Sequence, residues 1–387
     1  MIIQNIKMIC EEQWVKLQAD ISWLDKEERV FFAVPFVFSH YFDETLGDPF
    51  VMTFVQIAAK YDEDIIVKDA NITKNLAKKI ETILIPALAK MGCGTGKSKV
   101  VSSYRNSQDN KDKKIAATGI SLGVDSFYAI LSNLNTVNKT NPISGTVYIH
   151  QVNDWKSFNK SDLDEMLKPR KEVAQYYGLE LIPIVSNVRH VIEQELVFGQ
   201  FHTFCHVGCV ASLKKRIGIY YYATGYSDEE MKLDFSDSAY YENIIRETFT
   251  CENFKMISSG ASVTRFEKTK YVTNDSMVLK YLDVCYHDRE NPTKYINCSR
   301  CPKCYRTMAT LDVIGKLDKY YGVFDIAYYK RHRAKCWADI RYRQIIGKDH
   351  FSTEICTAAA QSGYKIPLRH WFYFLRIGLK NQINKLK

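Results

Sequence analysis

Hydrophobic positions along the first hundred residues follow the periods of strands and helices in turn. The segment 28–37 (ERVFFAVPFV) predicts a strand, and 50–60 (FVMTFVQIAAK) is an apolar element that ends before an acidic turn. The run from 65 to 91 predicts a strand, a helix cap at Asn71 and a helix that ends near Met91. This order predicts a small α/β domain at the N-terminus.

From Lys114 onward the pattern alternates between short apolar runs and amphipathic helical segments. Helical crossovers of this length connect parallel strands, so the pattern predicts an α/β fold with a doubly wound parallel sheet. Ligands of such sheets bind beyond the C-terminal ends of the strands. Strands are expected at 115–120, 145–152, 179–185 and 218–225, and helices at 127–134, 161–177 and 201–216.

Changes in composition divide the chain into three predicted parts: an N-terminal α/β domain with its linker (1–112), a nucleotide-binding domain (113–330) and a basic, aromatic helical tail (331–387). The polar stretch between Gly92 and Lys114 marks the first boundary. The tail ends in KIPLRHWFYFLRIGLKNQINKLK. A helix on a membrane surface or on a partner is the alternative there, but core packing of the aromatic stripe is favoured.

Composition excludes disordered and fibrous classes, since 46% of the residues are hydrophobic and 25% are charged. No apolar run approaches the length of a membrane span and no signal peptide is visible, so a cytoplasmic protein without a membrane partner is expected. The eleven cysteines argue against a disulfide framework in such a chain. The net charge of +9 is compatible with tRNA as a partner but does not favour it. A homodimer is a further alternative that the sequence does not decide.

Two glycine-containing stretches compete for the role of phosphate-binding loop. The first, Met91–Ser98 (MGCGTGKS), ends like a Walker A loop but has Met91 where the first glycine belongs. A helix is predicted before it and none after it, whereas a Walker loop leaves a strand and opens a helix. This stretch is therefore interpreted as a linker.

The second stretch follows the predicted strand 115–120 and leads directly into the predicted helix at 127–134. Glycine allows the backbone to approach an anion, serine hydroxyls donate to phosphate oxygens, and an aspartate can hold a metal ion that neutralises pyrophosphate. A plain strand–turn–helix with Ser and Asp caps is the alternative. The residues concerned are Ser121, Leu122, Gly123, Val124, Asp125 and Ser126.

This segment resembles the SGGxDS signature of the PP-loop ATP pyrophosphatases and departs from it at Leu122, where that family usually has Gly. The resemblance implies that ATP and Mg²⁺ bind at the loop and that an acceptor is adenylated with release of pyrophosphate. It also implies a catalytic role for Asp125 and Ser126. Arg265 and Lys268, in SSGASVTRFEKTKYV, are expected to neutralise charge on the leaving pyrophosphate, with a solvated helix start as the alternative.

A cysteine cluster predicts a zinc site. Cys298, Cys301 and Cys304 form C-x2-C-x2-C, and Cys285 lies 13 residues before the first of them. Four thiolates at this spacing can close a tetrahedral shell around Zn²⁺, the site type of a structural zinc knuckle. An iron–sulfur cluster and a redox-active pair are the alternatives.

The loop and the cluster together resemble the 7-cyano-7-deazaguanine synthases, over about residues 114–320. The segment Asn297–Thr307 is also similar to an N-C-x-x-C-x-K-C-x-R-T stretch of other PP-loop proteins. The resemblance implies an acceptor carboxylate that becomes an amide, nitrile or conjugate. It also implies an acceptor-binding loop at Gly225, Tyr226, Ser227 and Asp228, for which an ordinary surface loop is the alternative.

A histidine- and cysteine-rich segment, FHTFCHVGCVASL, completes the set of candidates. His202 and His206, with Cys205 and Cys209, have the i, i+4 spacing of a second metal site. A buried helix with its first turns near the nucleotide, and with His206 beside the substrate, is favoured instead. Sulfur transfer to tRNA or to a small molecule by way of adenylation, and a zinc-stabilised nucleotide-binding module without turnover, remain the alternative functions.

Overall fold

The computed structural model describes residues 1–106, 114–134, 140–251, 253–286 and 294–385. The described chain forms two compact units. Unit 1 consists of residues 1–120 and 132–259, and unit 2 of residues 121–131 and 260–387. The three-part division drawn from composition stays a prediction.

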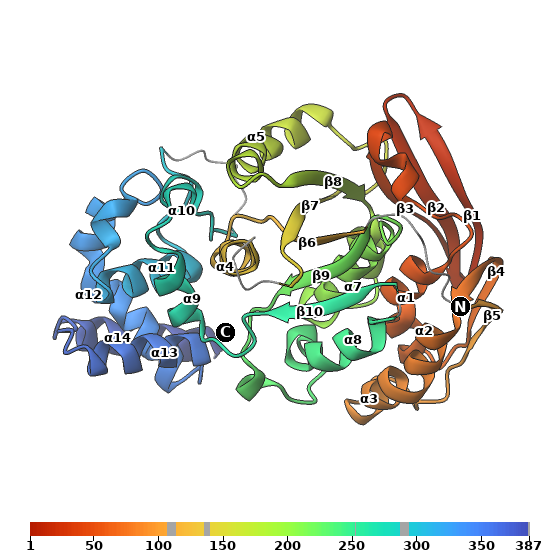
Figure 1. Cartoon of the computed structure of the whole chain (residues 1–387). Coiled ribbons are helices and arrows are strands. Elements are labelled where there is room, and N and C mark those ends of the chain that lie inside the picture. The colour runs from red at the N-terminus through yellow and green to blue at the C-terminus, as the bar shows by residue number, and fades with distance from the viewer. Residues whose placement is uncertain (107–113, 135–139, 252, 287–293, 386–387) are drawn as a thin grey trace. The chain divides into compact units, whose positions relative to one another are not determined.

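Unit 1 is built on one sheet of ten strands in the order β10-β9-β6-β7-β8-β3-β2-β1-β4-β5 (Figure 1). The pairs β1–β2, β2–β3 and β3–β8 are antiparallel, and the other six neighbouring pairs are parallel. The fold is therefore α/β with a mixed, mostly parallel sheet. The strands are β1 (Ile2–Glu11), β2 (Trp14–Trp23), β3 (Lys26–Pro35), β4 (Ile65–Thr73), β5 (Val100–Arg105), β6 (Ile115–Gly119), β7 (Ile143–Gln151), β8 (Glu180–Ser186), β9 (Ile217–Ala223) and β10 (Lys255–Ser259).

Helices cover both faces of this sheet, because successive strand residues point to opposite sides. In β3, Phe32 belongs to the large core that also contains α1 and α7, whereas Phe31 and Ala33 pack with Leu163 and Leu167 of α5. Two-sided coverage is what a doubly wound arrangement requires. The helices that begin or lie in this unit are α1 (Asp48–Lys60), α2 (Lys74–Lys79), α3 (Ile85–Lys90), α5 (Lys160–Tyr176), α6 (Val188–Ile192), α7 (Phe198–Ala211) and α8 (Glu242–Phe249), with a π-helical turn η2 (Ile80–Leu84) and 3₁₀ turns η1 (Phe36–Tyr41), η3 (Asp228–Glu230) and η4 (Ser238–Tyr241).

The expected elements appear with small shifts, and one local prediction is wrong. The apolar element at 50–60 is helix α1, which is buried along almost its whole length. Asn71 does not cap a helix, because β4 continues through it to Thr73 and the helical stretch starts at Lys74. The backbone of Asn71 is hydrogen bonded to the segment between η1 and α1 instead, since its carbonyl accepts from Gly47 and its N–H donates to Thr45.

Unit 2 is helical in its larger part. Its core joins α11, α12 and α13 through Ala309, Trp337, Ile340 and Ile355, all buried. The elements are α4 (Val124–Asn133, which begins in this unit), α9 (Arg265–Val272), α10 (Ser276–Tyr281), α11 (Pro302–Val313), η5 (Leu317–Tyr320), α12 (Ile326–Ile345), α13 (His350–Gln361) and α14 (His370–Lys385).

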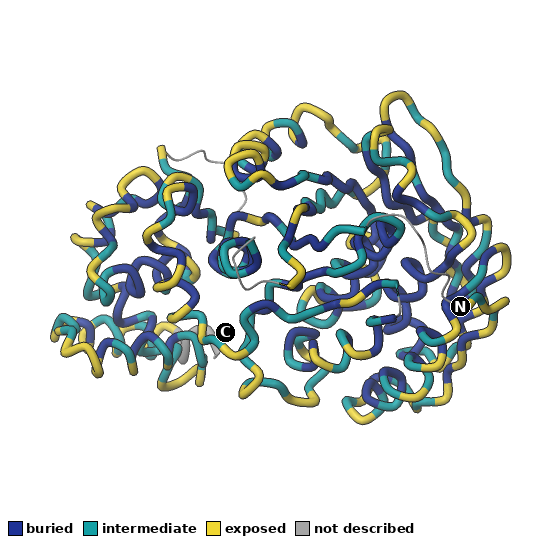
Figure 2. The backbone as a smooth tube through the Cα atoms, in the orientation of Figure 1, coloured by how far each residue is buried: buried dark blue, intermediate teal, exposed yellow. Residues whose placement is uncertain are grey.

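The aromatic stripe of the last helix is not core, which corrects the interpretation favoured from the sequence. Only one side of α14 packs, with the Phe374 ring centroid 5.5 Å from that of Tyr342 on α12. Phe372 and Leu375 remain more than half exposed. The tube of α14 is coloured mostly as intermediate and exposed (Figure 2). Within the described residues, no helix is both long enough and apolar enough to cross a bilayer.

Candidate functional site

The predicted phosphate loop directly follows β6 along the chain, and helix α4 begins at Val124. A helix N-terminus presents amide N–H groups and the positive end of the helix dipole. Within the loop, Ser126 Oγ accepts a hydrogen bond from the Ser121 amide at 3.0 Å, and Ser121 Oγ accepts from the Gly123 amide at 3.3 Å. Ser126 is buried and Ser121 is exposed, so the two hydroxyls differ in their access to a ligand.

Leu122 adopts a backbone conformation that glycine favours. Its φ is +69°, in the left-handed region where a branched side chain costs about 1 kcal/mol. Burial of its side chain offsets that cost, and its carbonyl accepts the Asp283 amide at 2.9 Å. The one departure from the SGGxDS signature thus has the backbone geometry that a glycine at this position would adopt most easily.

Asp125 is the centre of a charged cluster inside unit 2. Its Oδ2 lies 2.8 Å from Arg265 Nη1, and its Oδ1 lies 3.8 Å from Lys268 Nζ. Oδ1 is buried and accepts no hydrogen bond within the described part of the chain. Three residues that the sequence singled out for catalysis are therefore neighbours, with the Arg265 guanidinium on one oxygen of Asp125 and the Lys268 ammonium nearer the other.

The position of Lys268 depends on a glycine. Lys268 is fully buried on α9, and a Cβ added at Gly260 would lie 2.6 Å from its Cε and 2.9 Å from the Tyr128 ring. Gly260 also has a φ of +89°, which L-residues rarely adopt. The SSGAS sequence after β10 therefore leaves room for the lysine to reach the loop.

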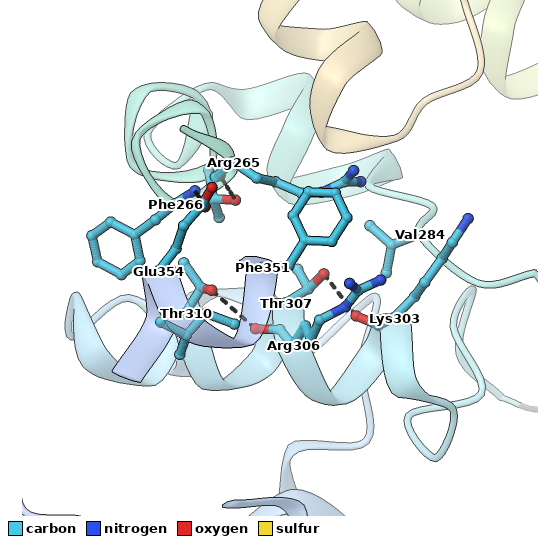
Figure 3. Close-up of a pocket in the computed structure, with 11 residues that line it drawn as sticks. Arg265, Phe266, Val284, Lys303, Arg306, Thr307, Thr310, Phe351 and Glu354 are labelled. Atoms are coloured by element: carbon cyan, nitrogen blue, oxygen red, sulfur yellow. Dashed lines mark hydrogen bonds between the residues drawn. The ribbon is translucent and has the colours of Figure 1, made fainter. Parts of the chain in front are cut away.

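A small pocket beside this cluster carries more positive than negative charge. It is lined by residues of α9, α11 and α13 and includes Arg265, Lys303, Arg306 and one acid, Glu354 (Figure 3). The Arg265 and Arg306 guanidinium carbons lie 5.3 and 4.6 Å from the centre of the Phe351 ring. The sequence did not predict that Lys303 and Arg306, which lie beside the cysteines in the chain, line a pocket together with Arg265.

The four cysteines that the sequence proposed as ligands form one cluster. All four sulfur atoms lie within 4.8 Å of one another, with separations of 3.4 Å for Cys301–Cys304, 3.8 Å for Cys298–Cys304 and 4.0 Å for Cys285–Cys301. A regular tetrahedron with Zn–S bonds of about 2.3 Å has edges of about 3.8 Å. The sulfur positions therefore suit a metal ion such as zinc.

Backbone amides around the cluster favour thiolates. The N–H groups of Arg300 and Cys301 point to Cys298 Sγ at 3.4 and 3.3 Å, and the N–H of Cys304 points to Cys301 Sγ at 3.4 Å. Hydrogen bonding from the Cys304 thiol and from its amide lowers the pKa of Cys301 to about 5, against the opposing effect of burial. Burial raises the pKa of Cys298, and the hydrogen bond to Cys301 raises that of Cys304, so without a metal ion this environment favours a thiolate at Cys301.

Asn297 joins the two arms of the cysteine cluster. Its buried side chain donates to the carbonyls of Leu282 and Val323 and accepts the Val284 amide at 2.9 Å. One side chain thus ties the segment leading to Cys285 to the segment that begins with Cys298. Asn297 is the first residue of the N-C-x-x-C pattern, which could have marked it as part of the site, but the sequence alone did not indicate its role.

The predicted acceptor loop lies in unit 1, just after β9 along the chain. The amide and the hydroxyl of Ser227 donate to the Glu230 carboxylate at 2.7 and 3.0 Å, which caps the short turn η3 that starts at Asp228. The Tyr226 hydroxyl donates to Asp237 Oδ2 at 3.3 Å. A Cβ at Gly225 would meet nothing within 4 Å, so this glycine borders open space.

The two histidines of α7 have separate partners. His202 Nε2 lies 2.9 Å from Asp237 Oδ1, whereas His206 Nε2 is hydrogen bonded to the Tyr220 hydroxyl. Burial, with a smaller effect of His202, lowers the pKa of His206 to about 4. Among the described residues, the cysteine cluster is the one group with metal-binding geometry. Helix α7 is largely buried, as favoured from the sequence, and the position of His206 beside the substrate stays a prediction.

The competing GKS stretch joins helix α3 to strand β5. It packs closely on the end of α1, since a Cβ at Gly94 would lie 1.8 Å from the Ala59 carbonyl oxygen. The Thr95 amide and hydroxyl donate to Asp62 at 2.6 and 2.8 Å. The strand-to-helix context of a Walker loop is absent from this described segment.

Comparison with models of known protein families gives no match, and comparisons with curated proteins and with solved structures give none either.

Proposed function

We propose that this chain is an ATP-dependent adenylating enzyme of the PP-loop ATP pyrophosphatase type. ATP would bind at the Ser121–Ser126 loop, an acceptor oxygen would attack its α-phosphorus, and pyrophosphate would leave. The observation that carries the proposal is the meeting of Asp125, Arg265 and Lys268 at a loop that links a parallel strand to a helix N-terminus. Such a loop suits an anion, and the cations suit the charge of a leaving pyrophosphate.

Each residue of the cluster has a distinct part in this proposal. Lys268 is 1% exposed, so its ammonium would act in a water-poor environment where a fixed charge has a large effect. Arg265 would exchange its contact with Asp125 for the phosphates. When bound, Mg²⁺ supplies positive charge to the phosphates, and Asp125 is the carboxylate of the loop that would hold it.

The acceptor, by the likeness to 7-cyano-7-deazaguanine synthases, would be a carboxylate or another carbonyl oxygen. Adenylation makes AMP the leaving group, which ammonia or an amine then displaces to form an amide or conjugate. A nitrile requires a second ATP, which adenylates the amide oxygen before AMP is lost from the resulting imidate. The cations of the pocket beside Asp125 favour an acceptor or leaving group that is anionic. Zinc in the cysteine cluster would hold the start of α11, on which Lys303 and Arg306 lie, and would take no part in the chemistry.

The test is conversion of α-labelled ATP to AMP in the presence of fractionated metabolite and protein extracts. Asp125→Ala and Ser126→Ala should abolish acceptor-dependent AMP formation. Lys97→Ala is the matched control, because it removes the cation of the competing GKS stretch and should leave turnover nearly unchanged. Loss of ATP binding in Lys97→Ala, with full activity in the other two variants, would show that the GKS stretch and not the Ser121–Ser126 loop binds ATP.

A further inference from the structure

The last helix presents large apolar side chains to solvent in a continuous row. Leu368, Phe372, Leu375 and Leu379 are 84, 61, 64 and 61% exposed, and Trp371 beside them is 45% exposed. Their spacing of three or four residues places them along one side of α14 and of the turn that precedes it. Large apolar groups scattered singly are normal on a surface, but a row of five is a mark of an interaction site.

The opposite side of α14 is already used for packing inside unit 2. The Phe374 ring faces Tyr342 of α12, and a Cβ added at Gly378 would touch the Tyr342 ring at 3.8 Å. Trp371 lies at the margin of the apolar row, where the Arg341 guanidinium of α12 is 5.6 Å from its ring. In Figure 1, α14 accordingly runs beside the other helices of this unit. The helix is thus held in place through one face while the apolar row points away from the unit.

Cations flank the apolar row and acids are missing. Arg369, Arg376 and Lys380 are exposed and have the same helical spacing as the apolar row, one residue further along. The Arg376 guanidinium lies 5.6 Å from the Phe372 ring, at the edge of the row. No Asp or Glu follows Glu354 in the sequence. An apolar face bordered by Arg and Lys is the pattern of helices that lie in the interface of an anionic bilayer.

Charge and shape decide against two other occupants. A second copy of the helix would bring Arg369, Arg376 and Lys380 against the same cations, with no acid on either helix to pair with them. Nucleic acid would satisfy the cations, but three of the five exposed apolar residues are leucines, which cannot stack on bases as aromatic rings do. An anionic lipid surface can bind both the apolar row, in its acyl region, and the cations, at its headgroups.

We propose that α14 is a peripheral membrane anchor that binds anionic lipid surfaces through Leu368, Trp371, Phe372, Leu375 and Leu379, with Arg369, Arg376 and Lys380 facing the headgroups. The helix lies along the surface and does not cross the bilayer, in keeping with the lack of a spanning helix among the described residues. This departs from the expectation of a protein without a membrane partner. It is independent of the ATP chemistry proposed above.

The test is sedimentation of the full zinc-loaded chain with vesicles of phosphatidylcholine alone and of phosphatidylcholine with 30% phosphatidylglycerol. Binding is expected to the anionic vesicles and to weaken with salt. The pair Arg376→Glu and Lys380→Glu should reduce it about tenfold or more, given about 1 kcal/mol for each cation near such a surface. The control pair Lys319→Glu and Arg331→Glu makes the same change of net charge elsewhere in unit 2 and should leave binding unchanged.

Two further measurements separate insertion from simple charge attraction. Leu375→Gln with Leu379→Gln should also abolish vesicle binding, and the blue shift of tryptophan fluorescence on binding should vanish in Trp371→Phe while binding persists. Equal binding by the Glu pair and its control would overturn the proposal. So would a dimer in solution that the two Gln substitutions dissolve, because a second copy would then cover the row.

Discussion

The Arg265 guanidinium lies 2.8 Å from the Asp125 carboxylate, although the two residues are 140 positions apart in the chain. Lys268, one helical turn after Arg265, approaches the other oxygen of the same carboxylate. The start of α9 and the start of α4 are therefore joined by charge at the loop where phosphate is proposed to bind. The predictions below test that junction, the cysteine cluster and the core around α7.

Replacing Arg265 by Gln should lower the rate of AMP formation by about a hundredfold, because one preorganised cation on a developing charge contributes on the order of 3 kcal/mol. Steady-state rates at saturating ATP measure this loss. Arg331→Gln is the matched control, since it is an exposed arginine on α12. If Arg265→Gln retained the wild-type rate while folding normally, the proposed role in pyrophosphate release would be wrong.

Purified protein should hold close to one zinc per chain. Cys301→Ser should lower metal content and thermal stability together, by on the order of 10 °C in Tm, because metal binding contributes free energy directly to the fold. Cys205→Ser and Cys209→Ser should leave metal content unchanged. Elemental analysis of the variants measures this, and an iron signal or zinc loss in Cys205→Ser would contradict the assigned ligands.

Asn297→Asp should weaken metal retention although the variant keeps all four cysteines. The carboxylate still accepts the Val284 amide but can no longer donate to the Leu282 and Val323 carbonyls, and the Val323 carbonyl keeps only the backbone N–H of residue 297. Each lost buried hydrogen bond costs about 1–3 kcal/mol. Competition with a zinc chelator should show release from Asn297→Asp at lower chelator concentration than from the exposed control Asn274→Asp; equal release would remove Asn297 from the metal site.

His206 should make the fold sensitive to acid. Its pKa of about 4 in the folded chain is below the usual 6.5, so the unfolded chain binds the proton more readily. The stability that depends on the neutral ring is complete above pH 6.5 and is lost as the pH falls towards 4, by about 3 kcal/mol. Denaturant unfolding of His206→Gln should show a flatter pH dependence in this window, and an unchanged slope would contradict the assignment.

Local patterns in the sequence predicted the alternation of strands and helices from β6 to β9, since these elements have clear periods and short connections. They did not predict that β3 joins β8, because that contact depends on the pairs Phe32–Ser186 and Ala33–Val185, which are far apart in sequence. They also missed the exposure of the α14 stripe. An amphipathic pattern shows that a helix has an apolar face but not whether the fold supplies a surface to cover it.

In the candidate site, too, local features could be predicted from the sequence and features that depend on distant segments could not. The spacing of the cysteines was sufficient to name all four members of the cluster, because metal ligands at close spacing constrain one another. The positive φ of Leu122 and the tie made by Asn297 could not be predicted, since each depends on a segment distant in sequence. The pairing of His202 with Asp237 likewise arises between α7 and the residue before η4.

The most direct test of the central claim is the identity of the product formed from ATP. Wild-type protein supplied with α-labelled ATP, Mg²⁺ and an acceptor-containing extract should yield AMP and pyrophosphate in equal amounts, and Asp125→Ala should yield neither. ADP with inorganic phosphate as the products, or equal AMP formation by Asp125→Ala, would contradict adenylation at the Ser121–Ser126 loop.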